Sequence, residues 1–556
     1  MNTDDKNFTL EDIINEWKKI SSSYGITWKD SFIKWDTPEE INADFAITLA
    51  LPISHILKKK PYEIALKIKN DFPNYSNFEI SISEQGYLNC NFKSEFFKKY
   101  LNDIASGSFL FFEKKNKLIN IEFVSVNPTG YLHLGHLRNA IIGDTISNIY
   151  QFIGYKVIRE YYINDRGNQI KDLLNSVLFY YFDNKKINFN IKEDDLKYKG
   201  VSTKDAALYF SKNEIFSLKD IEERKDFILN KIIGFFIDKI KSDLILCGVK
   251  FDNWFSEKKM YENKEILEKL LKDFELKNLT YKKDNALFLK TESAGDDKDR
   301  VIIKENGDYT YFLSDIIYHI DKLNRSDFLI NIWGSDHHGY IGRLLGSLDL
   351  LGYNSKEKIS IILIQMVSLL TEDGNKKFSK RLGTSIDVDE TLKIIEKDQL
   401  RFCLLEKETN HSLVINSEIL NDHKENSRLY YVQYAHARCN QILLKWESMK
   451  QKDDNLLIND FIILNELKER EILNNLIRFS QVVINSAEEK KPFLIIQYLQ
   501  SLSKDFQSYY QSYAILQNNN YELSKQRVIL VKAVKMTLSK GLELCGISAP
   551  DFMEKQ

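Results

Sequence analysis

The chain has 556 residues, and its 78 Lys and Arg residues nearly balance 80 Asp and Glu residues, which gives a formal net charge of −2. A chain of this length exceeds what one hydrophobic core supports, so we expect three or four domains. The charge balance excludes a polycation, and any nucleic acid must therefore be bound by local basic patches.

The five cysteines are scattered along the chain and form no Cys-x-x-Cys pair. This spacing argues against a zinc ribbon and against a disulfide scaffold. The first residues are polar and acidic, unlike a signal peptide, and no apolar run approaches the ~18 residues needed to span a bilayer. We therefore expect a cytoplasmic protein that binds no zinc and does not insert into a membrane.

The amino-terminal segment, residues 1–110, alternates helix-like and strand-like stretches. Its apolar periodicity predicts helices over residues 40–57 and 61–70. A hairpin is predicted over residues 78–92, with its turn at Gly86. This segment is interpreted as a small α/β appendage.

The most informative stretch is Asn-Pro-Thr-Gly-Tyr-Leu-His-Leu-Gly-His, residues 127–136. It follows an apolar run and precedes a predicted helix over residues 137–152, after which residues 155–163 read as a strand. This βαβ pattern places the histidines at a helix entrance on the carboxyl edge of a sheet, where an anion such as a phosphate binds well. His133 and His136 alone are equally compatible with a metal pair or with ordinary surface histidines.

Residues 167–275 show large apolar residues at helical spacing, including a long candidate helix over residues 221–247, and we expect a helical insertion there. Strands are predicted at residues 309–312 and 328–333, so that Gly334 ends a strand. His337 and His338 could be a zinc or iron pair. Adjacent residues on a strand point to opposite faces, which disfavours that interpretation.

A basic loop, residues 372–384, is bracketed by Gly374 and Gly383, and its Lys377, Lys380 and Arg381 could close over a polyphosphate. Taken alone, this loop is better explained as a solvated surface loop. From residue 392 onward the chain is predicted to be almost entirely helical, with helices over residues 430–446, 460–481 and 528–544.

Two of these pieces together resemble the signature pair of class I aminoacyl-tRNA synthetases. His-Leu-Gly-His, residues 133–136, resembles the family's HIGH motif, and Lys-Phe-Ser-Lys-Arg, residues 377–381, resembles its KMSKS motif. Further stretches resemble the arginyl-tRNA synthetase family in particular, in order over nearly the whole chain. These are residues 43–50, 86–92, 121–130, 162–169, 251–257, 309–319, 333–340, 430–438 and 546–550.

The resemblance implies an α/β class I synthetase fold, with a Rossmann-like parallel sheet, an α/β amino-terminal appendage and an all-α carboxyl-terminal bundle. The expected domains are an appendage that contacts tRNA, residues 1–112, a catalytic domain, residues 113–391, and an anticodon-binding domain, residues 392–556. The resemblance further implies ATP-dependent attachment of L-arginine to tRNA(Arg) through an arginyl-adenylate. Mg²⁺ is expected to accompany ATP, no DNA is expected as a partner, and the protein is expected to be a monomer.

The resemblance also implies roles for individual residues, transferred motif by motif. The catalytic residues would be His133, His136, Lys377 and Lys380. The ATP-binding residues would be Gly130, Leu134, Gly135, Gly334, Asp336, His337, Phe378 and Ser379. The arginine-binding residues would be Glu122, Asn127, Glu257, Tyr311 and Asp315, because a guanidinium is best held by carboxylates. The tRNA-binding residues would be Tyr431, Gln433, Tyr434 and Arg438.

The sequence leaves several alternatives open. Asp315 could be a helix N-cap, Glu122 could belong to a solvated strand ladder, and the tyrosines near residue 430 could be core residues. The whole chain could instead be another class I synthetase, a nucleotidylyltransferase that uses His-x-Gly-His, or an RNA-binding paralogue without catalysis. A nucleotidylyltransferase would not need the long helical carboxyl-terminal region, and a pure binder would not need both signature motifs.

Overall fold

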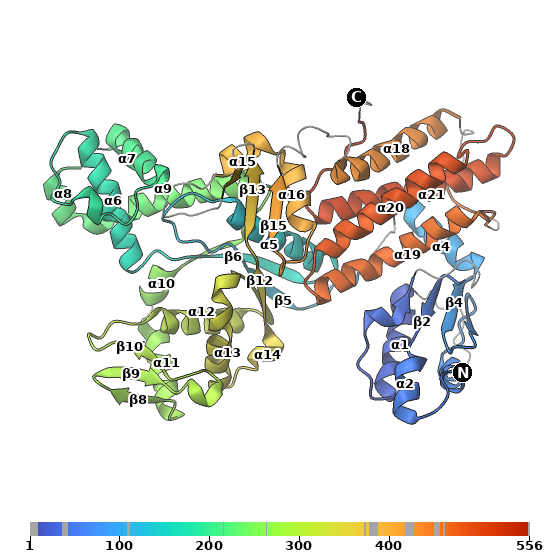
Figure 1. The fold of residues 1–556 in the computed structure, drawn as a ribbon, viewed down its shortest axis with the longest axis horizontal. Helices are drawn as coiled ribbons and strands as arrows, with labels where there is room; N and C mark the ends of the chain where they lie inside the picture. Colours follow the sequence, from blue (N-terminus) through green and yellow to red (C-terminus); the bar gives the residue numbers. More distant parts are fainter. Residues whose placement is uncertain are drawn as a thin grey trace.

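The structure is a computed structural model that describes residues 9–35, 43–107, 112–214, 216–262, 264–371, 374–376, 387–416, 427–449, 456–459 and 462–553. The molecule is elongated, with a helical subdomain at one end and a helix bundle at the other (Figure 1). A parallel sheet lies between them. No helix among these residues is long and apolar enough to cross a membrane.

The central sheet has five parallel strands in the order β12-β11-β5-β6-β7. Their bounds are β5 Leu118–Glu122, β6 Lys156–Ile163, β7 Asn253–Ser256, β11 Phe328–Gly334 and β12 Ile359–Ile364. The chain runs outward from β5 in one direction through β6 and β7, and from β11 in the other direction through β12. The strand order therefore reverses between β5 and β11, and such a reversal leaves a crevice outside the carboxyl ends of the strands.

The crossover from β5 to β6 is helix α5, Leu134–Phe152, as the βαβ pattern predicted. The helix is buried on nearly all sides, with Leu137, Ile141 and Ile149 in the core, because the sheet covers one side of it and other helices cover the other. Gly143 packs so closely on Phe123 that an added Cβ would lie 2.3 Å from the ring. The sequence thus fixes the helix tightly against the end of β5.

The amino-terminal domain is a four-stranded antiparallel sheet, β1-β2-β4-β3, packed on helices around Trp17 and Phe45. The strands are β1 Ile33–Lys34, β2 Phe45–Ile47, β3 Phe78–Ile82 and β4 Leu88–Phe92, and the helices are α1 Leu10–Ser23, α2 Ala50–Leu57, α3 Pro61–Asp71 and α4 Ser94–Ala105. The predicted hairpin with its turn at Gly86 is confirmed. The predicted single helix over residues 40–57 is wrong, because the fully buried β2 occupies its middle.

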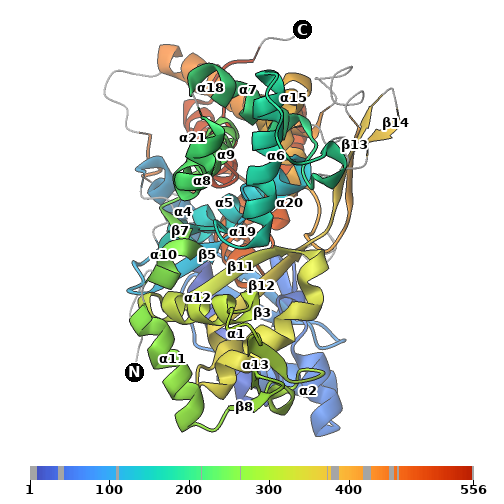
Figure 2. The ribbon, with the colours of Figure 1, turned by 90° about the vertical axis from the view of Figure 1, so that its left-hand side faces the viewer.

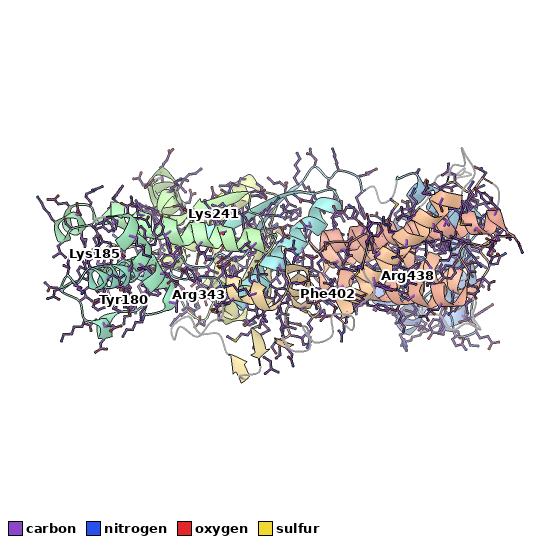
Figure 3. All side chains as sticks on the ribbon, turned by 90° about the horizontal axis from the view of Figure 1, so that it is seen from above. Tyr180, Lys185, Lys241, Arg343, Phe402 and Arg438 are labelled. Carbon is purple, nitrogen blue, oxygen red and sulfur yellow. The ribbon has the colours of Figure 1, made fainter. Side chains whose placement is uncertain are left out.

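The helical subdomain consists of α6 Asn168–Asn184, α7 Val201–Asn213, α8 Leu218–Glu223 and the long α9 Lys225–Leu246. These helices share an aromatic core around Tyr181, Phe210 and Phe236. In Figure 2 the subdomain lies above the central sheet with the bundle behind it, and Figure 3 labels Tyr180 and Lys185 on it. The prediction that residues 167–275 are all helical is wrong at β7, which is too short and too apolar to be told from a helical turn by periodicity.

The chain then passes through α10 Glu257–Glu262, α11 Lys264–Leu276 and a small antiparallel sheet of β8 Thr280–Lys283, β9 Ala286–Leu289 and β10 Arg300–Ile303. Helix α12, Tyr311–Arg325, follows. The strand predicted at residues 309–312 is therefore wrong. The buried residues here follow helical spacing: they are Phe312, Leu313, Ile316 and Ile317. This spacing is typical of a helix and not of a strand, in which every second residue would be buried.

After β11 come a 3-10 turn, η5 Ser335–Tyr340, then α13 Ile341–Leu350 and α14 Ser355–Lys358. Strands β13 Val367–Thr371, β14 Gly374–Lys376 and β15 Leu413–Asn416 form a second small sheet, and α15 Val388–Ile394 and α16 Lys397–Leu405 lie beside it. Strand β15 is a short exception to the almost entirely helical chain that was predicted after residue 392. Its pairing partner β13 lies before the basic loop, so the sequence gives no local sign of it.

The carboxyl-terminal bundle contains α18 Arg428–Met449, α19 Leu467–Glu488, α20 Phe493–Ser512 and α21 Tyr521–Leu544. Helices α18 and α21 include the predicted segments 430–446 and 528–544. The helix predicted over residues 460–481 begins later, at Leu467, and extends to Glu488.

Arg401 on α16 joins the end of the bundle to α5, which packs on the central sheet. It is fully buried, and its guanidinium donates to Asp144 Oδ2 at 2.6 Å, to the Cys545 carbonyl at 2.8 Å and to the Cys247 carbonyl at 2.9 Å. These partners lie on α5, after α21 and after α9. Gly546 has a φ of +67°, and a Cβ there would lie 2.3 Å from the guanidinium. One side chain therefore connects three parts of the chain.

Replacing Arg401 with leucine should lower the free energy of unfolding by about 3–5 kcal/mol, because the change leaves Asp144 buried without its closest cation. Urea denaturation followed by tryptophan fluorescence measures the change. Arg428→Leu is the matched control, since that side chain is 72% exposed in its ion pair with Glu406, and its effect should stay below about 1 kcal/mol. Equal effects of the two changes would contradict this role of Arg401.

Candidate active site

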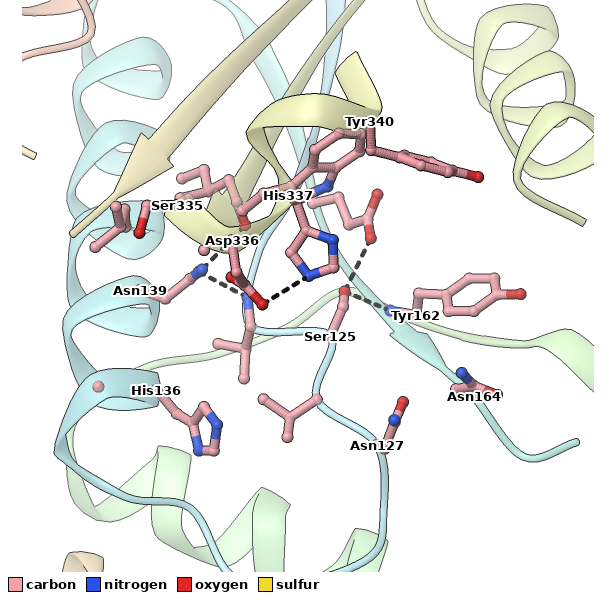
Figure 4. Close-up of a pocket in the computed structure, with 18 of the residues that line it drawn as sticks. Ser125, Asn127, His136, Asn139, Tyr162, Asn164, Ser335, Asp336, His337 and Tyr340 are labelled. Atoms are coloured by element: carbon pink, nitrogen blue, oxygen red, sulfur yellow. Dashed lines mark hydrogen bonds and ion pairs between the residues drawn. The ribbon is translucent and has the colours of Figure 1, made fainter. Parts of the chain in front are cut away.

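A cavity of about 820 Å³ opens at the reversal of strand order, outside the carboxyl ends of β5 and β11. Figure 4 shows side chains from the end of β5, from α5, from β6 and from η5 pointing into it. It is lined by Glu122, Val124, Ser125, Val126, Asn127, His133, Gly135, His136, Asn139, Tyr162, Asn164, Asp315, Tyr318, His319, Ile332, Trp333, Gly334, Ser335, Asp336, His337, Tyr340, Ile364, Gln365 and Met366.

The two histidines lie together at the amino end of α5. His133 is the N-cap residue, and its backbone N–H donates to Nδ1 of His136 at 3.2 Å. The imidazole rings stack with centroids 3.5 Å apart and an angle of 19° between their planes. Gly135 permits this stack, because a Cβ there would lie 3.1 Å from Cε1 of His133. Parallel rings do not converge on one point as a metal pair would, and they leave the helix terminus suited to an anion.

The turn between β5 and α5 is strained. Val124 and Ser125 have φ values of +67° and +41°, in the left-handed region that residues other than glycine rarely adopt. The turn is held by side chains: the Val124 N–H donates to Asn139 Oδ1 at 2.8 Å, and the Tyr162 N–H donates to Ser125 Oγ at 3.1 Å (Figure 4). These bonds direct Asn127 to the wall of the cavity.

Two carboxylates lie at the α12 side of the site. Asp315 lines the cavity and accepts a hydrogen bond from the Tyr340 hydroxyl, and Glu257 is only 2% exposed and accepts a hydrogen bond from Ser314 Oγ at 3.2 Å. Burial raises the pKa of each carboxyl group to about 7. Asp315 is the fifth residue of α12, whose N-cap is Thr310, so the alternative that Asp315 begins the helix is wrong.

The opposite side of the cavity is formed by the end of β11 and by η5. Gly334 is the last residue of β11, as predicted, and a Cβ there would lie 2.4 Å from Oδ1 of Asp336. Asp336 and His337 are exposed, and their side chains approach to 3.7 Å. His337 and His338 lie on a 3-10 turn beyond the end of the strand, so the rule that adjacent strand residues point to opposite faces does not apply to them.

The predicted site residues divide into three groups. Those that line the cavity are Glu122, Asn127, His133, Gly135, His136, Asp315, Gly334, Asp336 and His337. Gly130, Leu134, Glu257 and Tyr311 are not among the residues that line it. Leu134 is a core residue, and Tyr311 is 53% exposed with its hydroxyl against Gly167. Lys377, Phe378, Ser379 and Lys380 lie outside the described residues.

The predicted tRNA-binding residues lie on α18. Tyr431 is 39% exposed. Gln433 donates to the Ser548 carbonyl at 2.9 Å, and the Arg438 guanidinium, labelled in Figure 3, lies over the rings of Tyr434 and Tyr510 at 4.8 and 4.6 Å. Three of the four side chains are thus engaged within the protein, whereas Tyr431 presents its ring at the surface.

Three family models match consecutive parts of this chain. They are the arginyl tRNA synthetase N terminal domain over residues 9–92, the catalytic domain of tRNA synthetases class I (R) over residues 104–446, and the DALR anticodon binding domain over residues 432–553. The chain is 35% identical to an arginine–tRNA ligase of Mesoplasma florum, over 98% of this chain and 100% of the relative. It is 38% identical to an arginine–tRNA ligase of Ureaplasma parvum, over 92% and 93%.

The chain belongs to the arginyl-tRNA synthetase family. A solved structure of Thermus thermophilus arginyl-tRNA synthetase shares the fold, with a TM-score of 0.76 at 20% identity over 97% of this chain and 99% of that one. The class I catalytic fold with its parallel sheet, predicted from the signature motifs, is confirmed.

Several residues that line this cavity or support it were missed in the sequence. Asn139 holds the strained turn, Tyr340 bonds Asp315, and His319 lines the cavity beside Asp315. His319 and Tyr340 lie in stretches that resemble the family. The sequence could therefore have pointed to these residues, but not to what they contact. Asn139 lies three residues after His136, on the same face of α5, which is the one local signal that could have identified it.

The Asp315 carboxyl should destabilise the ligand-free protein at neutral and alkaline pH. Because its pKa is raised to about 7 in the folded state, the folded protein binds the proton more tightly than the unfolded chain, and stability rises as the pH falls through 7. Asp315→Asn should therefore raise the free energy of unfolding at pH 8 by about 1–3 kcal/mol. It should also weaken the dependence of stability on pH between 5 and 8. Urea denaturation at several pH values measures both, and a destabilised Asp315→Asn protein at pH 8 would contradict the assignment.

Proposed function

We propose that this protein attaches L-arginine to tRNA(Arg) in protein synthesis, by way of an arginyl-adenylate formed from arginine and ATP in the described cavity. The observation that supports the proposal is that groups suited to phosphate and groups suited to a guanidinium line the same cavity. The helix terminus with the paired histidines lies on one side, and Asp315, which accepts a hydrogen bond from Tyr340, lies on the other.

In the first step, the carboxylate oxygen of arginine attacks the α-phosphorus of ATP. The new P–O bond forms as the bond to the β-phosphate oxygen breaks, and pyrophosphate leaves. His133 and His136 donate hydrogen bonds to phosphate oxygens as charge develops there, at the positive end of α5. Lys377 and Lys380 are proposed to contact the β- and γ-phosphates. Catalysis of this kind depends on positioning and charge stabilisation.

ATP is proposed to bind along the α5 and β11 side of the cavity. Gly135 lets the purine approach the backbone, with Gly130 and Leu134 in the same turn, and Gly334, Asp336 and His337 contact the adenine or the ribose. Phe378 and Ser379 accompany the two lysines. Mg²⁺ is proposed to enter bound to the phosphates of ATP, as it does in most phosphoryl-transfer sites. The histidine pair is suited to those phosphates because both rings lie at a helix terminus.

Arginine is proposed to bind with its guanidinium toward α12. Asp315 and Glu257 supply the negative charge, and Tyr311 closes the side of the pocket. Neither carboxylate has an ion-pair partner within 4 Å among the described residues, and a substrate guanidinium would supply one. Asn127 is proposed to hold the α-amino end, with Glu122 supporting the turn behind it. Lysine or citrulline would leave part of this charge unpaired, which is the basis of rejection.

In the second step, a ribose hydroxyl at the 3′ end of the tRNA attacks the arginyl carbonyl, and AMP leaves. The bundle is proposed to bind the anticodon, with Tyr431 offering a stacking surface and Gln433, Tyr434 and Arg438 lying beside it. The amino-terminal domain is proposed to contact the same tRNA. We propose that the protein acts as a monomer in the cytoplasm.

Isotope exchange between pyrophosphate and ATP tests the proposal. The protein, with tRNA(Arg) present, should support exchange with arginine and not with lysine, citrulline or the other amino acids. Asp315→Asn should lower kcat/KM for arginine by about 100-fold or more, because the guanidinium loses a charged partner in a desolvated site. Exchange with a different amino acid, or none with any, would favour another synthetase or an RNA-binding protein. Undiminished exchange by Asp315→Asn would contradict the placement of the pocket.

Tyr431→Ala should raise the KM for tRNA(Arg) in aminoacylation by about 5- to 100-fold, because stacking on one base contributes about 1–3 kcal/mol. The KM values for arginine and ATP should stay unchanged. Tyr281→Ala is the matched control, since this tyrosine stacks on Phe288 in the small sheet of β8, β9 and β10, which lies outside the bundle. A tRNA KM that is the same for both variants would show that α18 does not present Tyr431 to the anticodon.

A further inference from the structure

We propose that Lys322 is a positioning residue for the amino acid substrate, because its buried ammonium group links the wall that holds the α-amino end of arginine to the wall that holds its guanidinium. The proposal rests on the binding mode of arginine given above. Lys322 itself does not line the cavity, so it acts through the residues that do.

The first arm runs from Lys322 to the strained turn. Lys322 is fully buried on α12, and its Nζ donates to Glu122 Oε2 at 2.6 Å. The other carboxylate oxygen of Glu122 accepts a hydrogen bond from Ser125 Oγ at 3.0 Å. Ser125 is one of the two left-handed residues of that turn, and Asn127 follows two residues later. Lys322 thus neutralises the carboxylate on which the turn is anchored.

The second arm runs from Lys322 to the carboxylate helix. Nζ also donates to Asn331 Oδ1 at 2.9 Å, and the Asn331 amide lies 2.7 Å from Nε2 of His319. Nδ1 of His319 lies 2.7 Å from the Asp315 carbonyl oxygen. A carbonyl can only accept, so Nδ1 carries the proton and Nε2 accepts from Asn331. Burial lowers the pKa of His319, which keeps the ring neutral and this pattern intact.

A lysine suits this network as long as Glu122 carries its charge. Its ammonium offers several donors from one atom, so it can serve a carboxylate and an amide at once while it lies over the Tyr318 ring, 4.2 Å from the centroid. Both arms end on residues at the amino acid side of the cavity. Neither arm passes through His133, His136 or Gly334, which form the proposed ATP side. Loss of Lys322 should therefore affect arginine more than ATP.

Lys322→Met in the full-length protein tests the proposal. In pyrophosphate exchange at saturating tRNA(Arg), the KM for arginine should rise by about tenfold or more, because small displacements of positioning groups are costly, whereas the KM for ATP should change by less than about threefold. Lys535→Met is the matched control. Lys535 also contacts an amide and a carboxylate, Asn440 and Asp551, each at 2.8 Å, and its loss should leave both KM values unchanged.

The double variant Lys322→Met/Glu122→Gln distinguishes a positioning role of Lys322 from general destabilisation of the protein. A neutral glutamine needs no cation and can still accept from Ser125, so most of the loss in arginine KM should be recovered. Equal rises in both KM values, or no recovery in the double variant, would overturn the proposal. If Lys322→Met does not fold, Asn331→Leu interrupts the second arm alone, and an unchanged arginine KM there would overturn it as well. Absence of arginine-dependent exchange in the parent protein would instead contradict the proposed function.

Discussion

The reversal of strand order between β5 and β11 is the constraint on which the rest of the molecule depends. The chain leaves these two adjacent parallel strands in opposite directions. A crevice that no crossover helix covers therefore remains between them. In this chain β5 must then turn sharply to begin α5 beside that crevice. The left-handed pair Val124 and Ser125 makes the turn, at the conformational cost expected of residues other than glycine. Two hydrogen bonds offset part of that cost: the Val124 N–H donates to Asn139 Oδ1, and the Tyr162 N–H donates to Ser125 Oγ.

The buried carboxylates in and near the cavity fall into two groups, which differ in whether a cation of the protein faces them. Glu122 and Glu160 face buried or half-buried cations: Lys322 lies 2.6 Å from Glu122, and Arg325 lies 2.6 Å from Glu160. These cations hold the pKa of Glu160 below its ordinary value against the effect of burial. Asp315 and Glu257 have hydroxyl partners instead, and the pKa of each is raised. The fold thus stabilises one pair of charges and leaves the other pair dependent on what enters the cavity.

Features that depend on local pattern could be predicted from the sequence, and features that depend on distant partners could not. The βαβ unit, the histidines at the helix entrance and the end of β11 at Gly334 all followed from short-range signals. The strand expected at residues 309–312 failed because four residues cannot show a period, and β2 was hidden among apolar residues that suit a helix equally well. The contact between Lys322 and Glu122 joins residues 200 positions apart, so no spacing in the sequence points to it.

Helix α5 belongs to the active site at one end and to the bundle at the other. Its amino end carries the paired histidines, whereas near its carboxyl end the Tyr150 hydroxyl donates to the Ala487 carbonyl at 2.9 Å and Asn148 donates to the Leu544 carbonyl at 3.2 Å. Between them, Asp144 holds the buried guanidinium of Arg401. Because this helix of 19 residues is held at both ends and in the middle, it behaves as a rigid body. It therefore fixes where the histidines lie relative to the bundle. The distance from the bundle to the histidines is therefore set by covalent geometry and packing. Under the proposed function, a tRNA bound to the bundle would therefore lie at a fixed distance from the paired histidines.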